Sequence, residues 1–328
     1  MTFFMRKRNE LKMTKKYDVF IIGAGVAGLY TSIIIKKGTP MQVPSEPITV
    51  GVAEANRIGG LTKYAFIQIT KKWAFSGSNL IRTLYGEAVQ AGVDFFENSN
   101  VTKIVRQDNN FKIITNDEIY VAKYVIVATG ILTFPNILDT PEKTNIGLHT
   151  PEEMVKEITK EFGWKKVLVV GNESTSINNL ATRINNSNQF DKVDSYLINK
   201  NVNINSDYFG LDENLTSNYD GILFDYNSYK LNNGSTAFLN NLNILQENGY
   251  VEANAFGETR VPGLFAVGSV TMPISGVPEA IYSGQVTGLY VGHLLEKTTI
   301  ADYSGRFPFL PREENWKYSF QHKLEKDK

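Results

Sequence analysis

Apolar runs separated by glycine-containing turns divide the chain into short predicted strands and helices. Short, uninterrupted apolar runs are typical of strands buried in a sheet, and apolar positions at helical spacing predict helices. In the first half, the predicted strands span 17–22, 48–53, 101–105, 111–115, 118–121 and 124–130, and the predicted helices end near 37 and span about 78–91. Asn and Asp turns separate the strands between 101 and 121, which predicts a β-meander.

The second half begins with a similar succession of strand, glycine turn and helix. Its predicted helices span about 150–161, end near 185 and span about 278–295, and its predicted strands span 166–170, 193–199 and 220–224. This alternation predicts an α/β protein with two Rossmann-like dinucleotide-binding domains of three-layer ββα type, the first of them discontinuous. We expect the first domain over 15–140 and 245–300, a shortened second domain over 141–244, a disordered leader over 1–14 and an aromatic tail over 301–328.

Composition and charge narrow the classes of function. Hydrophobic residues make up 42% of the 328 residues and charged residues 21%, which is typical of a folded globular protein. Because 34 basic side chains balance 34 acidic ones, no net field favours nucleic acid or an anionic membrane. The uncharged run from Val19 to Ile35 contains three glycines and is too short to span a bilayer, so we expect a buried strand and helix in a cytoplasmic protein.

Cysteine is absent from the chain, and histidine is rare. The chain therefore has no disulfide, no thiolate ligand for a metal or an iron–sulfur cluster, and no redox pair of cysteines. His149, His293 and His322 lack the spacing that metal ligands show, so we expect no protein-bound metal.

A glycine motif follows the first predicted strand and opens the first predicted helix. In G-A-G-V-A-G, Gly23 permits a tight turn, Gly25 lets the main chain approach a pyrophosphate, and Gly28 allows close packing of helix on strand. The amides and the dipole at the start of the helix attract phosphates. Glu54, at the end of the second strand, is suited to accept hydrogen bonds from ribose hydroxyls. The pattern predicts a dinucleotide site and does not distinguish FAD from NAD.

A family resemblance rests on four motifs in a fixed order: G-A-G-V-A-G at 23–28, E-A-N-R-I-G-G-L at 54–61, Y-V-I-V-A-T-G at 124–130 and T-R-V-P-G-L-F-A-V-G-S at 259–269. The set resembles the low-molecular-weight thioredoxin reductase superfamily, two-domain flavoproteins that include the thioredoxin-reductase-like ferredoxin-NADP reductases and are usually homodimers. The resemblance implies FAD as the cofactor. The residues that it implies for the FAD site are Gly23, Gly25, Ala27, Gly28, Glu54, Gly60, Leu61, Val101, Thr129, Gly130, Gly268, Ser269, Glu279 and Ala280.

The resemblance also assigns parts of the cofactor to some of these residues. It implies that Val101 lies near the adenine, and that the amides around Glu279 and Ala280 donate to the O2 edge of the flavin. Ser269 stands where the family has Asp, so a neutral hydroxyl replaces a charge-assisted hydrogen bond to the ribityl chain.

The second half departs from the family pattern. The family has a C-x-x-C pair in its nicotinamide domain, and this chain has I-G-L-H-T-P-E-E-M over 146–154 in the matching stretch. Gly171, Glu173 and Ser176 stand where the family has G-x-G-x-x-A or G, so an acidic side chain occupies the position where the main chain should touch a pyrophosphate. The next strand ends with a single basic residue, Lys200, where a cluster for a 2′-phosphate is expected. NAD(P)H binding is therefore doubtful.

These features predict an FAD-dependent oxidoreductase without a redox dithiol, in which electrons pass through the flavin and conventional NADPH binding is impaired or absent. We expect a homodimer whose electron acceptor is a small redox protein or a small molecule, with neither nucleic acid nor membrane as a partner. No side chain is identified as a catalytic acid or base. One alternative is a ferredoxin-NADP reductase, because the aromatic tail resembles the C-terminal extension of those enzymes in position. Another is a non-catalytic flavin-binding sensor, which the altered second motif suggests.

Overall fold

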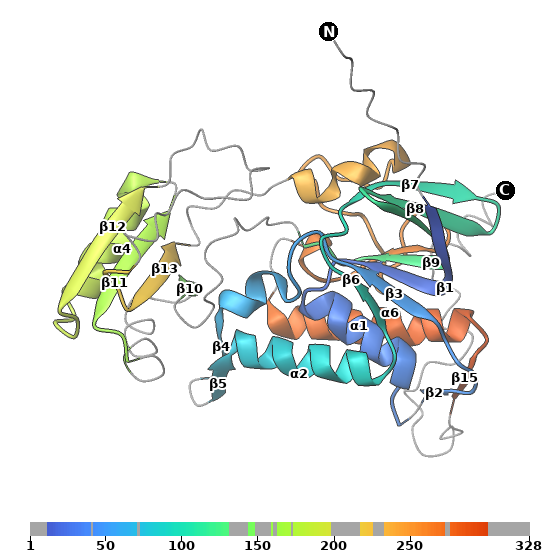
Figure 1. Ribbon diagram of the computed structural model, residues 1–328, viewed down its shortest axis with the longest axis horizontal. Coiled ribbons are helices and arrows are strands. Elements are labelled where there is room, and N and C mark those ends of the chain that lie inside the picture. The colour runs from blue at the N-terminus through green and yellow to red at the C-terminus, as the bar shows by residue number, and fades with distance from the viewer. Residues whose placement is uncertain are drawn as a thin grey trace, which may run out of the picture. The chain divides into compact units, whose positions relative to one another are not determined.

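A computed structural model describes residues 12–40, 42–70, 73–130, 144–147, 159, 163–171, 173–197, 217–225, 233–272 and 276–300 (Figure 1). Contacts between Cα atoms group the chain into a first unit, Met1–Ile58, Glu87–Thr129 and Thr236–Lys328, and a second unit, Gly59–Gly86 and Gly130–Ser235. The two units are defined by contacts between Cα atoms, whereas the predicted domains are defined by sequence motifs. The units therefore do not test the predicted domain limits, which stay predictions. The tail over 301–328 and the helix predicted over 150–161, except residue 159, lie outside the described residues.

The first unit contains a seven-stranded sheet with the order β6-β3-β1-β9-β8-β7, and β14 also pairs with β9. Its strands are β1 (Lys12–Ile22), β3 (Val50–Ala53), β6 (Asp94–Phe96), β7 (Val101–Gln107), β8 (Asn110–Thr115), β9 (Glu118–Val127) and β14 (Leu264–Ala266). The strand β1 runs parallel to both of its neighbours, and β7, β8 and β9 form the predicted antiparallel meander. The unit is thus of the expected α/β class, with a parallel centre at β1.

Two strands differ from the sequence prediction. The strand expected over 118–121 continues into the motif at 124–130 as the single strand β9, which ends at Val127, because the in-and-out pattern continues across the join: Ala122 is buried and Lys123 is exposed. The strand β1 begins at Lys12, inside the segment expected to be a disordered leader, because it pairs with β9 as far as Glu118.

Helices α1 (Val26–Lys37) and α6 (Val277–Leu294) lie side by side on one face of this sheet (Figure 1). Glycines of α6 permit the close contact, since a Cβ added at Gly288 would lie 2.8 Å from Cγ2 of Ile34. The uncharged run over 19–35 therefore belongs to β1, the turn and α1, as expected. Among the described residues, no helix has both the length and the hydrophobicity needed to cross a bilayer.

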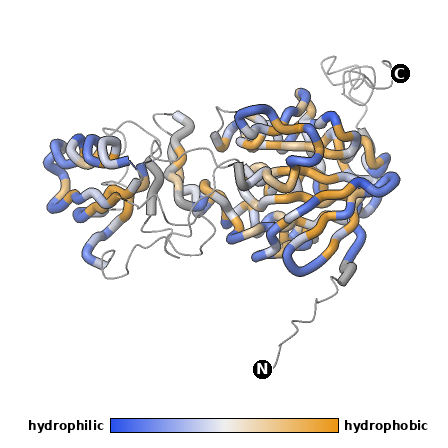
Figure 2. The backbone as a smooth tube through the Cα atoms, turned by 90° about the horizontal axis from the view of Figure 1, so that it is seen from above, coloured by the Kyte–Doolittle hydropathy of each residue, from blue (hydrophilic) through white to orange (hydrophobic). Residues whose placement is uncertain are grey.

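The core of the first unit contains side chains of the sheet strands packed with residues between 239 and 270, and it is rich in aromatic rings. The rings of Phe20 and Tyr120 are stacked at a centroid distance of 4.7 Å, and Phe96 packs against both. Figure 2 shows hydrophobic stretches along the inner strands and hydrophilic ones at the turns. Burial of such rings contributes a large share of the stability of a core.

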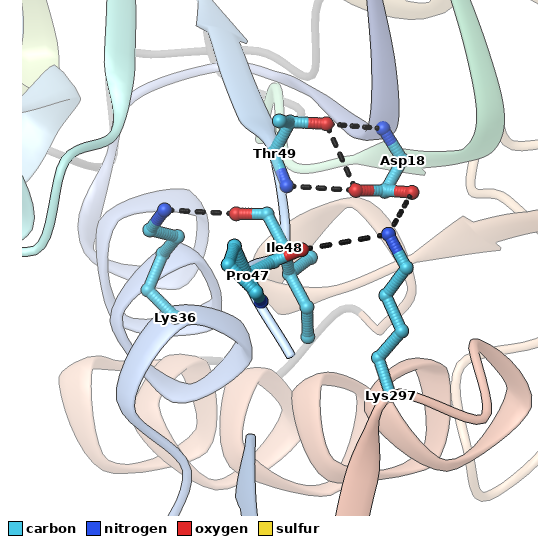
Figure 3. A network of polar contacts seen from close by, with 6 residues as sticks. All are labelled: Asp18, Lys36, Pro47, Ile48, Thr49 and Lys297. Atoms are coloured by element: carbon cyan, nitrogen blue, oxygen red, sulfur yellow. Dashed lines mark hydrogen bonds and ion pairs between the residues drawn. The ribbon is translucent and has the colours of Figure 1, made fainter. Parts of the chain in front are cut away.

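A polar network joins the middle of β1 to the residues that precede β3 (Figure 3). The carboxylate of Asp18 accepts hydrogen bonds from the Thr49 N–H at 2.8 Å and from the Lys297 ammonium at 2.8 Å. Lys36 donates to the carbonyl of Ile48 at 2.8 Å. Burial alone would raise the pKa of Asp18, but the hydrogen bonds from Lys297 and Thr49 outweigh it and lower that pKa. Through Lys297, the network connects the segment after α6 to β1 and to the residues before β3.

The described elements outside the main sheets include the 14-residue helix α2 and several shorter segments. Outside the main sheets they are β2 (Gln42–Pro44), η1 (Gly60–Tyr64), β4 (Phe66–Thr70), β5 (Trp73–Ser76), α2 (Gly77–Gln90), η5 (Asn233–Leu242), η6 (Gly268–Val270) and β15 (Thr298–Ile300). The strands β2 and β15 pair with each other, as do β4 and β5.

The second unit contains a four-stranded parallel sheet with the order β10-β13-β11-β12. Its strands are β10 (Thr144–Gly147), β11 (Lys166–Gly171), β12 (Lys192–Leu197) and β13 (Gly221–Asp225), and helix α4 (Ser174–Asn185) connects β11 to β12. The side chains of Ile177 and Ile184 on α4 pack with Val167 and Val169 of β11. This arrangement is the second Rossmann-like unit that the sequence predicts.

Candidate cofactor site

The first glycine turn lies where the order of the strands reverses direction around β1. From β1 the chain passes through α1 to β3 on one side, whereas β9 occupies the other side. In open parallel sheets, ligands bind at the carboxyl edge at such a switch point. Gly23 directly follows β1, and Ala128 directly follows β9 at the neighbouring position of the register.

The three glycines of the turn have two different roles. A Cβ added at Gly23, whose φ is +104°, would lie 2.5 Å from the carbonyl oxygen of Ala128, and one at Gly28 would lie 2.0 Å from the carbonyl oxygen of Gly23. These two residues must be glycine for the helix to pack on the sheet. Gly25, the N-cap of α1, has open space instead, since no atom of the described residues lies within 4 Å of an added Cβ. An approaching anion can therefore reach the main chain at Gly25.

Glu54 follows β3 and reaches back to the glycine turn. Its two carboxylate oxygens accept hydrogen bonds from the N–H of Ala24 at 2.8 Å and from the N–H of Asn56 at 3.0 Å. Burial raises the pKa of Glu54, although these two amides oppose the shift. The carboxylate is thus held beside the start of α1. The sequence places Glu54 at the strand end, and only the structure reveals the contact with Ala24.

The turn after β14 closes against the same helix. Gly268 has a φ of +74°, and an added Cβ would lie 2.7 Å from Cβ of Ala27 in the first turn of α1. The N–H of Gly268 donates to Oγ of Ser283 on α6 at 3.0 Å. Ser269 follows within η6. Gly268 is therefore brought to Ala27 at the beginning of α1, and both residues were expected at the cofactor together with Ser269, the next residue along the chain.

At the start of α6, some of the groups that were expected to bind the flavin form hydrogen bonds within the helix instead. The side chain of Glu279 accepts a hydrogen bond from the N–H of Gly276 at 2.9 Å and so caps the helix. The N–H of Ala280 donates to the carbonyl of Gly276 at 3.0 Å. The Ala280 amide already donates to a carbonyl of the helix. The Glu279 amide, in the first helical turn, is therefore the better placed of the two predicted donors to the flavin.

The other predicted residues lie in several places. The side chain of Val101 belongs to the buried core of the first unit, and Thr129 ends the stretch of that unit that contains β9. Gly60, Leu61 and Gly130 belong to the second unit. Within it, Gly60 begins η1 with a φ of +53°, and the carbonyl of Gly130 accepts a hydrogen bond from Ser235 at 3.0 Å. Their roles in binding a cofactor stay predictions.

The second glycine turn has the same local architecture and different chemistry. Gly171 ends β11, and Glu173 is the exposed N-cap of α4. The hydroxyl of Ser176, in the first turn of α4, donates to the carboxylate of Asp225, which is 1% exposed at the end of β13. Sequence reasoning missed Asp225, although an acid directly after a buried strand is the same signal that identified Glu54.

Comparisons with known proteins agree with the motifs. Residues 50–195 match the family described as pyridine nucleotide-disulphide oxidoreductase. A 34.2 kDa protein in the rubredoxin operon of Clostridium pasteurianum is 27% identical over 322 residues, which cover 86% of this chain and 99% of that protein. A ferredoxin-NADP reductase of Ligilactobacillus salivarius is 32% identical over 124 residues, which cover 36% of this chain and only 34% of the relative.

A solved structure has the same fold. The thioredoxin reductase of Streptococcus pyogenes superposes with a TM-score of 0.54 at 20% identity, and the match covers 86% of this chain and 98% of that one. The match over 50–195 shows that part of the chain is similar to pyridine nucleotide-disulphide oxidoreductases, and the solved structure shows that the chain has the fold of a thioredoxin reductase, which agrees with the resemblance seen in its motifs. Since the chain contains no cysteine, it lacks the redox dithiol of thioredoxin reductases. Among the described residues, no group of three potential ligands is arranged to hold a metal.

Proposed function

We propose that this chain is an FAD-dependent oxidoreductase without a redox dithiol, which passes electrons through the flavin and binds NADPH poorly or not at all. The observation that carries the proposal is the position of Glu54. Its carboxylate is fixed by the amides of Ala24 and Asn56 beside the open main chain of Gly25. A ribose and a pyrophosphate are the two groups that such a pair of neighbouring sites accommodates.

The residues of the first unit suggest how FAD would be held. The first amides of α1 would bind the pyrophosphate above Gly25, and Glu54 would accept the ribose hydroxyls. Ser269 would offer a hydroxyl to the ribityl chain, and the start of α6 at Glu279 would stabilise negative charge on the flavin. When bound, FAD would supply the exchange of electron pairs and of single electrons. We further propose a cytoplasmic homodimer with a small redox protein or a small molecule as the acceptor.

The visible spectrum of the purified protein tests this function. We expect flavin absorbance, or its appearance after FAD is added to the protein and the excess is removed by gel filtration. FMN and riboflavin serve as controls, because they lack the adenosine ribose and the pyrophosphate that the site requires. A protein that retains no FAD under these conditions, or that retains riboflavin equally well, would overturn the proposal.

A ferredoxin-NADP reductase is the second candidate, favoured by the name of the Ligilactobacillus salivarius relative. It differs from the first candidate in the electron donor. Anaerobic mixing of the FAD-loaded protein with millimolar NADPH or NADH in a stopped-flow instrument separates the two. Rapid bleaching of the flavin absorbance supports a reductase, and no bleaching with either nucleotide supports the first candidate.

A further inference from the structure

The second unit also has a switch point, and Asp225 lies there. From β11 the chain passes through α4 to β12 on one side, whereas β13 occupies the other side. The register pairs Val170 with Phe224, so Gly171 and Asp225 are neighbours at the carboxyl ends of β11 and β13. This edge is where a dinucleotide lies in a Rossmann-like fold, with its pyrophosphate at the start of the helix.

The carboxylate of Asp225 is directed at the start of that helix. It accepts the hydrogen bond of the Ser176 hydroxyl, and Ser176 is the third residue of α4. The side chain of Asp225 is almost fully buried, so its position is defined by the surrounding core. A negative group near the N-terminus of a helix interacts favourably with the helix dipole, as a phosphate would.

We propose that Asp225 is a specificity-determining residue whose carboxylate takes the place of a pyrophosphate at α4, so that the second crevice rejects NAD(P)H. Glu173 adds a second negative group at the N-cap of the same helix. The inference rests on the proposed function, in which NADPH binding is impaired, and it names the group responsible. Electrons must then reach the flavin from a donor that is not a nicotinamide dinucleotide and that does not use this crevice.

Electrostatics sets the expected size of the effect. A unit charge about 4 Å from a phosphate costs about fivefold in affinity even in water, and more where the charge is buried. Glu173 is exposed, so its removal should tighten binding by about fivefold. Asp225 is buried and also occupies space beside Gly171, so its neutralisation should tighten binding by about tenfold or more.

The test is calorimetric titration of the full-length protein with NADP⁺ and NAD⁺, which bind without reducing the flavin. The variants are Asp225→Asn, Glu173→Gly and the pair. Asp191→Asn is the matched control, because it removes one negative charge from an exposed position just before β12, at the opposite edge of the same sheet. Far-ultraviolet circular dichroism confirms folding, and the visible spectrum of each sample reports FAD separately.

We expect the wild type and Asp191→Asn to bind neither nucleotide below millimolar concentration, and the double variant to bind at least one about fiftyfold more tightly. Micromolar binding by the wild type would overturn the inference, as would a folded double variant that binds no better than the wild type. If Asp225→Asn fails to fold, Asp225→Ser decides, because it removes the charge and leaves a smaller side chain with a hydroxyl that can still bond to Ser176. The proposed function fails separately, by absence of flavin.

Discussion

The two glycine turns of this chain have the same position in the same kind of unit and contain opposite chemistry. Position by position, Gly23, Gly25 and Gly28 of the first correspond to Gly171, Glu173 and Ser176 of the second. The register extends the correspondence to the neighbouring strand, where Ala128 follows β9 and Asp225 is the last residue of β13. The first glycine turn lies against main chain and small side chains, and the second lies beside a buried carboxylate.

This difference between the two turns indicates that the switch point of a sheet determines the position of a ligand site and not the kind of ligand that binds there. In the proposed account, the sign of the charge at that point comes from the residue at the carboxyl end of the neighbouring strand. In the first unit this residue is alanine, and the acid, Glu54, lies on the opposite side, where β3 ends. There it accepts an amide of the turn and is available to a ribose. In the second unit the acid, Asp225, instead contacts Ser176 at the start of helix α4.

The largest effect is expected from placing an aspartate in the first unit at Ala128, the position that corresponds to Asp225 in the second. Ala128→Asp should reduce FAD affinity by about a hundredfold or more and lower the free energy of unfolding by about 3 kcal/mol, because Ala128 is buried and the new charge has no partner there. Flavin content after gel filtration and urea unfolding measure the two effects.

The control is Ala128→Asn, which has the shape of the aspartate and no charge. It should retain more FAD than Ala128→Asp by at least about tenfold. Equal loss in the two variants would show that space, and not charge, distinguishes the crevices.

A smaller effect is expected from Glu54→Gln, which keeps the size of the side chain and removes its charge. We expect FAD affinity to fall by about tenfold, because neutral hydrogen bonds to ribose hydroxyls are weaker than charge-assisted ones. Glu97→Gln is the control, since Glu97 is a nearby exposed acid. Fluorescence titration with FAD measures both, and equal affinities for the two variants would remove Glu54 from the site.

The pH dependence of FAD binding sharpens this prediction. Burial raises the pKa of Glu54 above its ordinary value of 4.5, so the carboxylate takes up a proton at a higher pH than an exposed glutamate does. Protonation removes the charged acceptor. The affinity of the wild type should therefore fall as the pH drops through this raised pKa, and that of Glu54→Gln should not. A wild-type affinity that is constant down to pH 4 would contradict the assignment.

Sequence patterns predict most of the fold because burial and chain geometry leave a signal at each residue. The glycine turns, α1, α4 and the meander follow directly from such patterns. The short strands β2, β4, β5, β6, β10 and β15 are not predicted, because three to five residues carry too little periodicity. Contacts between distant segments also leave no local signal. Examples are the amide of Ala24 on Glu54 and the hydroxyl of Ser176 on Asp225.

The edges opposite the crevices are alike in the two units and provide the smallest test. Asp18 accepts a main-chain N–H from Thr49, and Asp220 accepts those of Lys165 and Lys166. The anchoring at these edges is therefore similar in the two units, in contrast to the residues around their glycine turns. We therefore expect changes at Asp18 to affect stability and to leave FAD affinity unchanged.

Lys297→Met removes the cation beside Asp18 and keeps the aliphatic length of the side chain. The free energy of unfolding should fall by about 1–2 kcal/mol, because both partners of this ion pair are largely buried. Lys37→Met, which breaks the exposed pair with Glu87, should cost about 0.5 kcal/mol or less. The lowered pKa of Asp18 stabilises the fold above its ordinary value of 3.8, and this contribution is lost as the pH falls through the lowered value. The deficit of Lys297→Met, measured by urea unfolding, should accordingly be largest near neutral pH and shrink below about pH 4. A deficit that persists at pH 2 would mean that Lys297 acts through packing instead of charge.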